Sequence, residues 1–128
     1  MDLFSNLKKM RILLIDDDEW IRDSMGLFFD SQGCDFFALE TAEEAIEELK
    51  NQYYEIIIAD YKLPGMDGLE FFKKIVKSHP GVIKILISAY EPDNIPSKGL
   101  NMGIDDFIPK PLTSESILSS LSHLIAKD

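Results

Sequence analysis

The sequence is poor in three features that mark other classes of protein: cysteine, positive charge and long apolar runs. Cys34 is its single cysteine, so no disulfide can form within the chain, and a reducing compartment, the cytoplasm, is expected. Thirteen Lys and Arg against 23 Asp and Glu give a net charge of −10, which disfavours direct binding to nucleic acid or anionic lipid. No apolar run approaches the length of a membrane span or a signal peptide. We therefore expect a soluble protein with neither a nucleic-acid nor a membrane partner.

What remains is a composition typical of one globular domain. The 128 residues suffice for a single hydrophobic core, and 45% of them are hydrophobic while 28% are charged. We expect this domain to span residues 10–128. Residues 1–9 form an N-terminal extension, and their polarity favours a disordered arm over an added contact.

Short apolar runs rich in β-branched residues alternate along the chain with segments of helical spacing. The runs are continuous, as is typical of strands that are buried on both faces. They predict strands at residues 12–15, 36–39, 56–59, 82–87 and 106–108. Helical spacing appears at residues 21–29, 42–49, 69–76 and 117–125. Strands that alternate with helices predict a three-layer α/β fold, a five-stranded parallel sheet with helices on both faces.

One helix of this fold is expected to be short. Pro96 and Gly99 interrupt the stretch from 92 to 103, between the last two strands. Ile95 is biased away from helical geometry because a proline follows it. The sequence therefore predicts a short fourth helix.

Reactive side chains gather where the predicted strands end. Asp16 and Asp17 follow the first strand, Asp60 the third, Ser88 the fourth and Lys110 the fifth. In an open parallel sheet, ligands bind outside these carboxyl ends. Each residue alone has an ordinary structural explanation, such as a helix cap, a turn or a surface lysine. Together, the carboxylates call for a divalent cation, and Mg²⁺ with a lysine and a hydroxyl suits phosphoryl transfer to a carboxylate.

Four motifs resemble the receiver domain of two-component response regulators, the CheY-like family, over residues 10–126. They are residues 12–18 (ILLIDDD), 58–68 (IADYKLPGMDG), 87–89 (ISA) and 103–111 (GIDDFIPKP). The resemblance implies a flavodoxin-like, doubly wound sheet and a phosphorylation-activated switch in a phosphorelay. Such a domain is no enzyme beyond its own phosphorylation and dephosphorylation. Its partners would be a sensor histidine kinase or a histidine phosphotransfer protein, and an unknown downstream protein or output domain.

The resemblance also implies a role for each acidic residue of the site. Asp60 would accept the phosphoryl group from a partner phosphohistidine. Asp17, Asp60 and the backbone carbonyl of Lys62 would hold Mg²⁺ (or Mn²⁺) directly, and Asp16 would assist through water. These four residues are the implied metal site.

Four further roles concern catalysis, switching and lifetime. Lys110 would pair with the phosphoryl oxygens, and Ser88 would hydrogen-bond to them once Asp60 is modified. Ser88 and Phe107 would then move together as the switch, changing the surface of the fourth helix, fifth strand and last helix. Phe107 could equally be a plain core aromatic. Lys62 and Tyr90, two residues beyond Asp60 and Ser88, would tune the lifetime of the phosphoryl group, although Tyr90 could also be an ordinary surface tyrosine.

Other functions remain open at this point. Residues 13–18 also resemble a phosphohydrolase of the haloacid dehalogenase type, with Asp16 as nucleophile and Asp18 as acid, although such enzymes usually need a cap and a longer chain. A receiver-like interaction module that is never phosphorylated is a second alternative. It is disfavoured because none of the site positions has been lost from the sequence. A flavodoxin-like cofactor binder is disfavoured, because the acidic loop after the first strand would repel a phosphate. Whether the domain stands alone or comes from a longer protein is open too.

Overall fold

The structure is a computed structural model that describes residues 2–89 and 103–125. Its elements in chain order are α1 (Leu3–Leu7), β1 (Arg11–Ile15), α2 (Glu19–Ser31), β2 (Asp35–Leu39), α3 (Ala42–Leu49), β3 (Ile56–Asp60), α4 (Gly68–Ile75), β4 (Ile83–Ser88), β5 (Asp106–Pro109) and α6 (Ser114–Ile125). All five predicted strands are present, with ends that differ from the prediction by a single residue. Tyr90 and nearly all of the stretch expected to form the short fourth helix lie outside the described residues.

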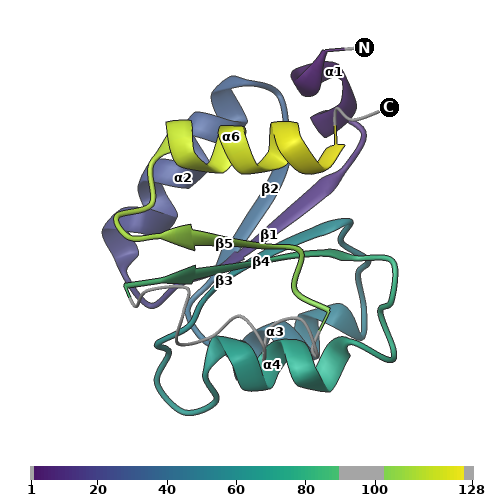
Figure 1. The fold of residues 1–128 in the computed structure, drawn as a ribbon, viewed down its shortest axis with the longest axis vertical. Coiled ribbons are helices and arrows are strands. Elements are labelled where there is room, and N and C mark those ends of the chain that lie inside the picture. The colour runs from purple at the N-terminus through teal and green to yellow at the C-terminus, as the bar shows by residue number, and fades with distance from the viewer. Residues whose placement is uncertain (1, 90–102, 126–128) are drawn as a thin grey trace.

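The five strands form one parallel sheet in the order β2-β1-β3-β4-β5. The chain leaves β1 for one edge of the sheet and then returns to the other side of β1 (Figure 1). The order therefore reverses between β1 and β3, and their carboxyl ends flank the crevice in which such sheets bind ligands. This topology directs attention to the residues that end β1 and β3.

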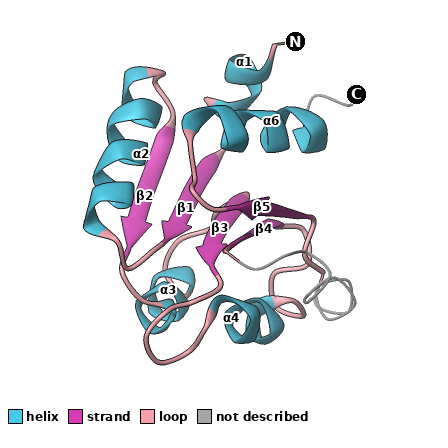
Figure 2. Ribbon diagram, turned by 60° about the vertical axis from the view of Figure 1, so that its left-hand side comes forward, coloured by secondary structure: helices cyan, strands magenta, loops and turns pink. Residues whose placement is uncertain are grey.

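Helices cover both faces of the sheet, as Figure 2 shows: α2 and α6 lie on one side, α3 and α4 on the other. Side chains alternate along each strand, so Leu13 and Ile15 pack toward α3 and α4, while Ile12 and Leu14 pack toward α2 and α6. Both sets are fully buried. The central strands β1, β3 and β4 are continuous apolar runs because both of their faces are covered, whereas the edge strand β2 is partly exposed. The predicted three-layer fold is confirmed.

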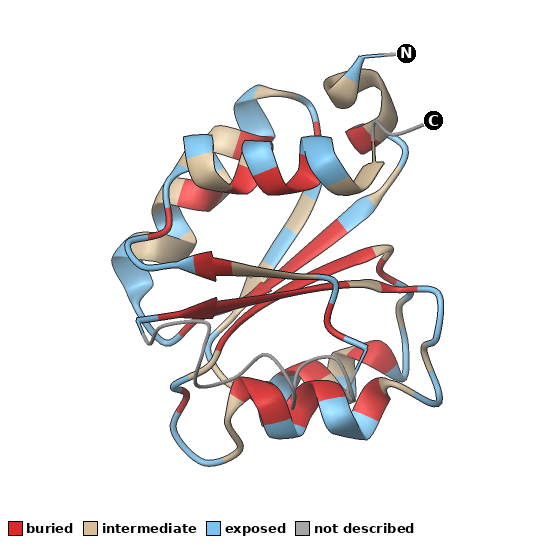
Figure 3. Ribbon diagram, viewed as in Figure 1, coloured by how far each residue is buried: buried red, intermediate tan, exposed pale blue. Residues whose placement is uncertain are grey.

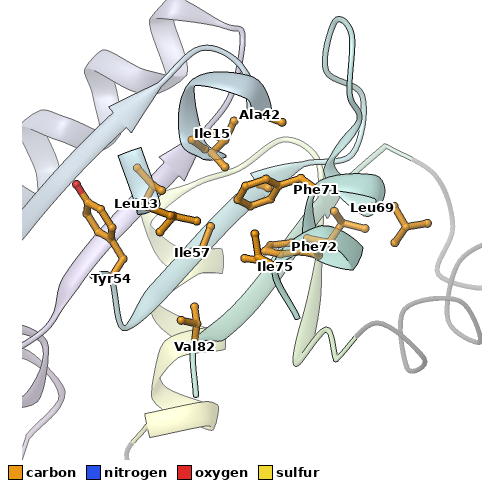
Figure 4. Close-up of a cluster of buried hydrophobic side chains, with 14 of the residues drawn as sticks. Leu13, Ile15, Ala42, Tyr54, Ile57, Leu69, Phe71, Phe72, Ile75 and Val82 are labelled. Carbon is orange, nitrogen blue, oxygen red and sulfur yellow. The ribbon is translucent and has the colours of Figure 1, made fainter. Parts of the chain in front are cut away.

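Burial is concentrated along the central strands and on the inner sides of the helices (Figure 3). Every residue of β3 is buried. On the α3–α4 side, Phe71 and Phe72 are fully buried in one cluster with Leu13 and Ile57 of the sheet (Figure 4). Burying a side chain of this size stabilises a fold by roughly 1.5–3 kcal/mol. This packing holds the sheet rigid beneath its carboxyl edge.

The N-terminal segment corrects an expectation. Residues 2–9 are not a disordered arm: Asp2 caps α1 by accepting a hydrogen bond from the Ser5 amide at 2.9 Å. Leu7 is fully buried in the α2–α6 core, and α1 packs against α6 (Figure 1). Leu3, Phe4 and Leu7 form a short apolar face of α1, which the surrounding polar residues make hard to recognise in the sequence. A domain boundary at residue 10 stays a prediction.

Among the described residues, no helix is long and apolar enough to cross a membrane.

Candidate functional site

The candidate site is a cleft of about 510 Å³ at the carboxyl edge of the sheet. Asp16, Asp17, Asp18, Ile21, Ile87, Lys110, Pro111 and Leu112 line it. They come from the ends of β1, β4 and β5 and from the start of α2. The cleft therefore lies where the strand topology predicts a ligand site.

Three carboxylates converge at this edge. Asp16, Asp17 and Asp60 each offer an oxygen, and these oxygens lie within 4.8 Å of one another. Asp16 and Asp60 are buried, at 3% and 1% exposed, while Asp17 is exposed. Asp60 is the last residue of β3 and pairs in register with Ile87 of β4. The predicted acidic cluster is confirmed as a spatial cluster.

Lys110 supplies the opposing charge. Its Nζ lies 2.7 Å from Asp60 Oδ2, and its backbone N–H donates to the Ser88 carbonyl at 3.0 Å. The second contact continues the pairing of β4 with β5, in which Ser88 faces Pro109. The Lys110–Pro111 peptide bond is cis. Pairing of the last two strands thus brings the Lys110 ammonium to the Asp60 carboxylate.

The pKa values of the site reflect burial opposed by pairing. Burial raises the pKa of Asp16 to about 6, against a hydrogen bond from the Asp18 amide that lowers it, and the Asp60 charge raises it further. Burial also raises the pKa of Asp60, although the ion pair with Lys110 acts to lower it. Burial lowers the pKa of Lys110, but the nearby carboxylates outweigh this effect and the net shift is upward. The carboxylates outnumber the ammonium that pairs with them, which leaves a negatively charged site of hard oxygen ligands.

The loop of residues 61–67 folds back on this site. The Lys62 amide donates to Asp60 Oδ1 at 3.2 Å. At the base of the loop, the Gly68 amide donates to the Tyr61 carbonyl at 2.9 Å. A Cβ atom at Gly68 would overlap the Asp60 backbone carbonyl, so this close approach needs glycine. Lys62, the predicted source of a carbonyl ligand, is therefore hydrogen-bonded directly to Asp60.

Ser88 and Phe107 lie on adjacent strands beside the cluster. Ser88 is 4% exposed and ends β4, one residue beyond the partner of Asp60. Phe107 is half-buried against the α3–α4 core and faces Leu86 across the β4–β5 pair. The Ser88 carbonyl contacts the Lys110 amide, whereas Phe107 lies two residues before Pro109, the partner of Ser88. The roles of both residues in switching stay predictions. Tyr90 lies outside the described residues.

Two further residues near the cleft have structural tasks. Asp18 caps α2, because its Oδ1 accepts hydrogen bonds from the Trp20 and Ile21 amides at 2.9 and 3.4 Å. The dehalogenase-type alternative assigns this same carboxylate as its acid. Arg22, which the sequence does not single out, donates from Nη1 to the Asp16 carbonyl at 2.8 Å. Its spacing from Asp18 predicts at most a side-chain pair along α2, so no sequence signal identifies the contact with the Asp16 carbonyl.

Comparison with known proteins agrees with this geometry. The profile of the response regulator receiver domain matches residues 12–122. A cyclic di-GMP phosphodiesterase of Thermotoga maritima is 31% identical over 116 residues, which cover 91% of this chain and 31% of that protein. The transcriptional regulatory protein AruR of Pseudomonas aeruginosa is 33% identical over 123 residues, covering 91% of this chain and 50% of that protein. The chain thus spans about a third to a half of the length of these relatives.

A solved structure agrees over nearly the full length of both chains. The CheY-like response regulator receiver domain of Methanospirillum hungatei is 30% identical and superposes with a TM-score of 0.84, covering 92% of this chain and 94% of that one. The acidic cluster of Asp16, Asp17 and Asp60 lies within the residues that the receiver-domain profile matches. The chain therefore belongs to the response regulator receiver domain family, the phosphorylation-activated signalling switches of two-component systems.

Proposed function

We propose that Asp60 accepts a phosphoryl group from a phosphohistidine of a sensor histidine kinase or a histidine phosphotransfer protein. The observation that carries this proposal is the buried Asp60 carboxylate, 2.7 Å from the Lys110 ammonium and clustered with Asp16 and Asp17. A buried nucleophile with one cation and a set of hard oxygen ligands around it fits phosphoryl transfer, in which positioning and charge neutralisation do most of the work.

The donor set fits magnesium. Asp17, Asp60 and the Lys62 carbonyl would hold the ion directly, with Asp16 assisting, and Mn²⁺ would fit the same hard oxygen ligands. When bound, the ion supplies neutralising charge to the phosphoryl oxygens. Its presence would also relieve the repulsion among the three carboxylates, which the Lys110 ammonium alone only partly offsets.

The transfer itself depends on Asp60 and Lys110. A carboxylate oxygen of Asp60 attacks phosphorus, the phosphorus–nitrogen bond of the donor breaks, and the partner histidine leaves with its nitrogen electron pair. Lys110, already paired with Asp60 Oδ2, takes up the phosphoryl oxygens as charge moves onto them. The chain catalyses only this modification and its reversal.

The output begins at Ser88 and Phe107. The Ser88 hydroxyl hydrogen-bonds to the new phosphoryl oxygens, and Phe107 moves with it, changing the surface around β5 and α6. Lys62 and Tyr90 tune how long the phosphoryl group survives. A downstream protein or an output domain in the same polypeptide reads this surface, and the proposed location is the cytoplasm.

Intact mass measurement after incubation with a small-molecule phosphodonor tests the proposal. We expect one phosphoryl adduct that needs Mg²⁺, is absent from Asp60→Asn and is kept by Asp18→Asn. Asp18→Asn is the matched control because Asp18 lines the cleft beside Asp16, Asp17 and Lys110 but only caps α2. Loss of the adduct in Asp18→Asn but not in Asp60→Asn would support the phosphohydrolase. No adduct under any condition would support the unphosphorylated interaction module.

A further inference from the structure

A carboxylate outside the acidic cleft holds the loop of residues 61–67. Glu43, in the first turn of α3, accepts a hydrogen bond at Oε2 from the Met66 amide at 3.0 Å. The two residues are 23 positions apart in the chain, so this contact joins separate elements. The same hydrogen bond lowers the pKa of Glu43, which keeps its carboxylate ionised as an acceptor.

The loop is shaped to receive this carboxylate. Gly65, the residue before Met66, has a φ of +75°, which side-chain-bearing residues rarely adopt. A Cβ atom there would lie 2.6 Å from Glu43 Oε2. Glycine at position 65 thus permits both the backbone turn and the close approach of Glu43. Both the positive φ of Gly65 and its missing side chain are therefore needed for Glu43 to approach the loop.

The loop is tied at its two ends in different ways. At its start, Lys62 is bound to Asp60, and Leu63 is buried in the α3–α4 core. Near the other end of the loop, Met66 donates a hydrogen bond to Glu43 of helix α3. Lys62 belongs to this loop, and its carbonyl is a proposed magnesium ligand. A change at Glu43 can therefore reach the metal site through backbone alone.

We propose that Glu43 is a positioning residue for the magnesium site, holding the loop of residues 61–67 so that the Lys62 carbonyl is set for the ion. This inference rests on the proposed function, because it presumes that magnesium binds at Asp17, Asp60 and Lys62. Glu43 touches neither the ion nor the phosphoryl group. It acts through its hydrogen bond to Met66.

Calorimetric titration with Mg²⁺ alone tests this role by comparing Glu43→Ala with Glu43→Gln. Both variants remove one negative charge, but glutamine keeps an oxygen that accepts the Met66 hydrogen bond. Loss of a direct partner of a metal ligand typically costs about 10–100-fold in affinity. Glu43 bonds Met66 and not a ligand, so we expect Glu43→Ala to weaken Mg²⁺ binding by less than this, about threefold to tenfold. Glu43→Gln should stay close to Glu47→Ala, an exposed charge loss on the same helix whose carboxylate pairs with Lys50.

A second readout is amide hydrogen exchange at Met66, which should become faster in Glu43→Ala and stay slow in Glu43→Gln. Equal Mg²⁺ affinity in the alanine and glutamine variants would overturn the inference, even if the alanine variant melted at a lower temperature. The proposed function would fail differently. In that case the unmodified chain would bind no Mg²⁺, or Asp17→Asn would bind it equally well.

Discussion

Burying the carboxylate of Asp16 lowers the stability of the fold, and this effect can be measured through its pKa. Asp16 is 3% exposed, it lies beside Asp60, and its pKa is raised to about 6 by burial first and by the neighbouring carboxylates second. In the unfolded chain the same carboxyl has its ordinary pKa of 3.8. Folding therefore favours the protonated form, and this contribution to stability is complete below pH 3.8 and is lost as the pH rises through about 6.

This shift makes a prediction about the metal-free protein. In a chelating buffer, the free energy of unfolding should fall by about 1.4 kcal/mol more between pH 5 and pH 7.5 in the unmodified chain than in Asp16→Asn. Asparagine cannot ionise, so the variant loses the contribution of Asp16 and keeps that of Asp60, whose pKa is also raised by burial. Urea unfolding at the two pH values measures both. A variant with the same pH dependence as the unmodified chain would contradict the assigned burial cost.

For single residues, the sequence predicts the charged side chains of the site but not the residues that hold the surrounding loop in place. Asp16, Asp60 and Lys110 are identified because they follow strands, and parallel strands place such residues at one edge. Glu43 escapes prediction because its contact with Met66 spans 23 residues and neither residue carries a local signal for it. Such a contact depends on where one helix lies beside a distant loop.

Among the helices and strands, α1 shows most clearly that tertiary packing, and not the local sequence pattern, can determine whether a segment is helical. Its five residues are too few to form a stable helix alone. The buried Leu7 and the contact with α6 therefore carry its stability. A sequence pattern with only three apolar positions among polar ones does not separate such a helix from a disordered arm.

Leu7→Ala should lower the free energy of unfolding by about 2 to 4 kcal/mol, since it removes a fully buried side chain and leaves a cavity. Lys8→Ala is the matched control, because Lys8 is exposed in the same segment and should change stability by less than about 0.5 kcal/mol. Urea unfolding followed by far-ultraviolet circular dichroism compares the two. Equally small effects would mean that α1 does not dock on α6 in solution.

At the scale of the whole molecule, the alternation of buried strands with helices determines where chemistry can occur. The prediction of the sheet succeeds because residues such as Leu13 and Leu14 face opposite cores, so both must be apolar. Its strand ends miss by a residue because Asp60 and Ser88 are polar yet continue the ladder. The reversal of strand order between β1 and β3 then explains why the acidic cluster of Asp16, Asp17 and Asp60 lies at this edge of the sheet.

The central claim is that Asp60 itself carries the phosphoryl group, and chemical trapping tests it most directly. Borohydride reduces an acyl phosphate to an alcohol, so phosphorylated chain treated in this way and digested should contain homoserine at the modified position. We predict homoserine at position 60 in samples phosphorylated with Mg²⁺, and unmodified Asp60 when the phosphodonor or the ion is omitted. Homoserine at position 16, or a stable phosphoryl group on any other residue with Asp60 intact, would contradict the account.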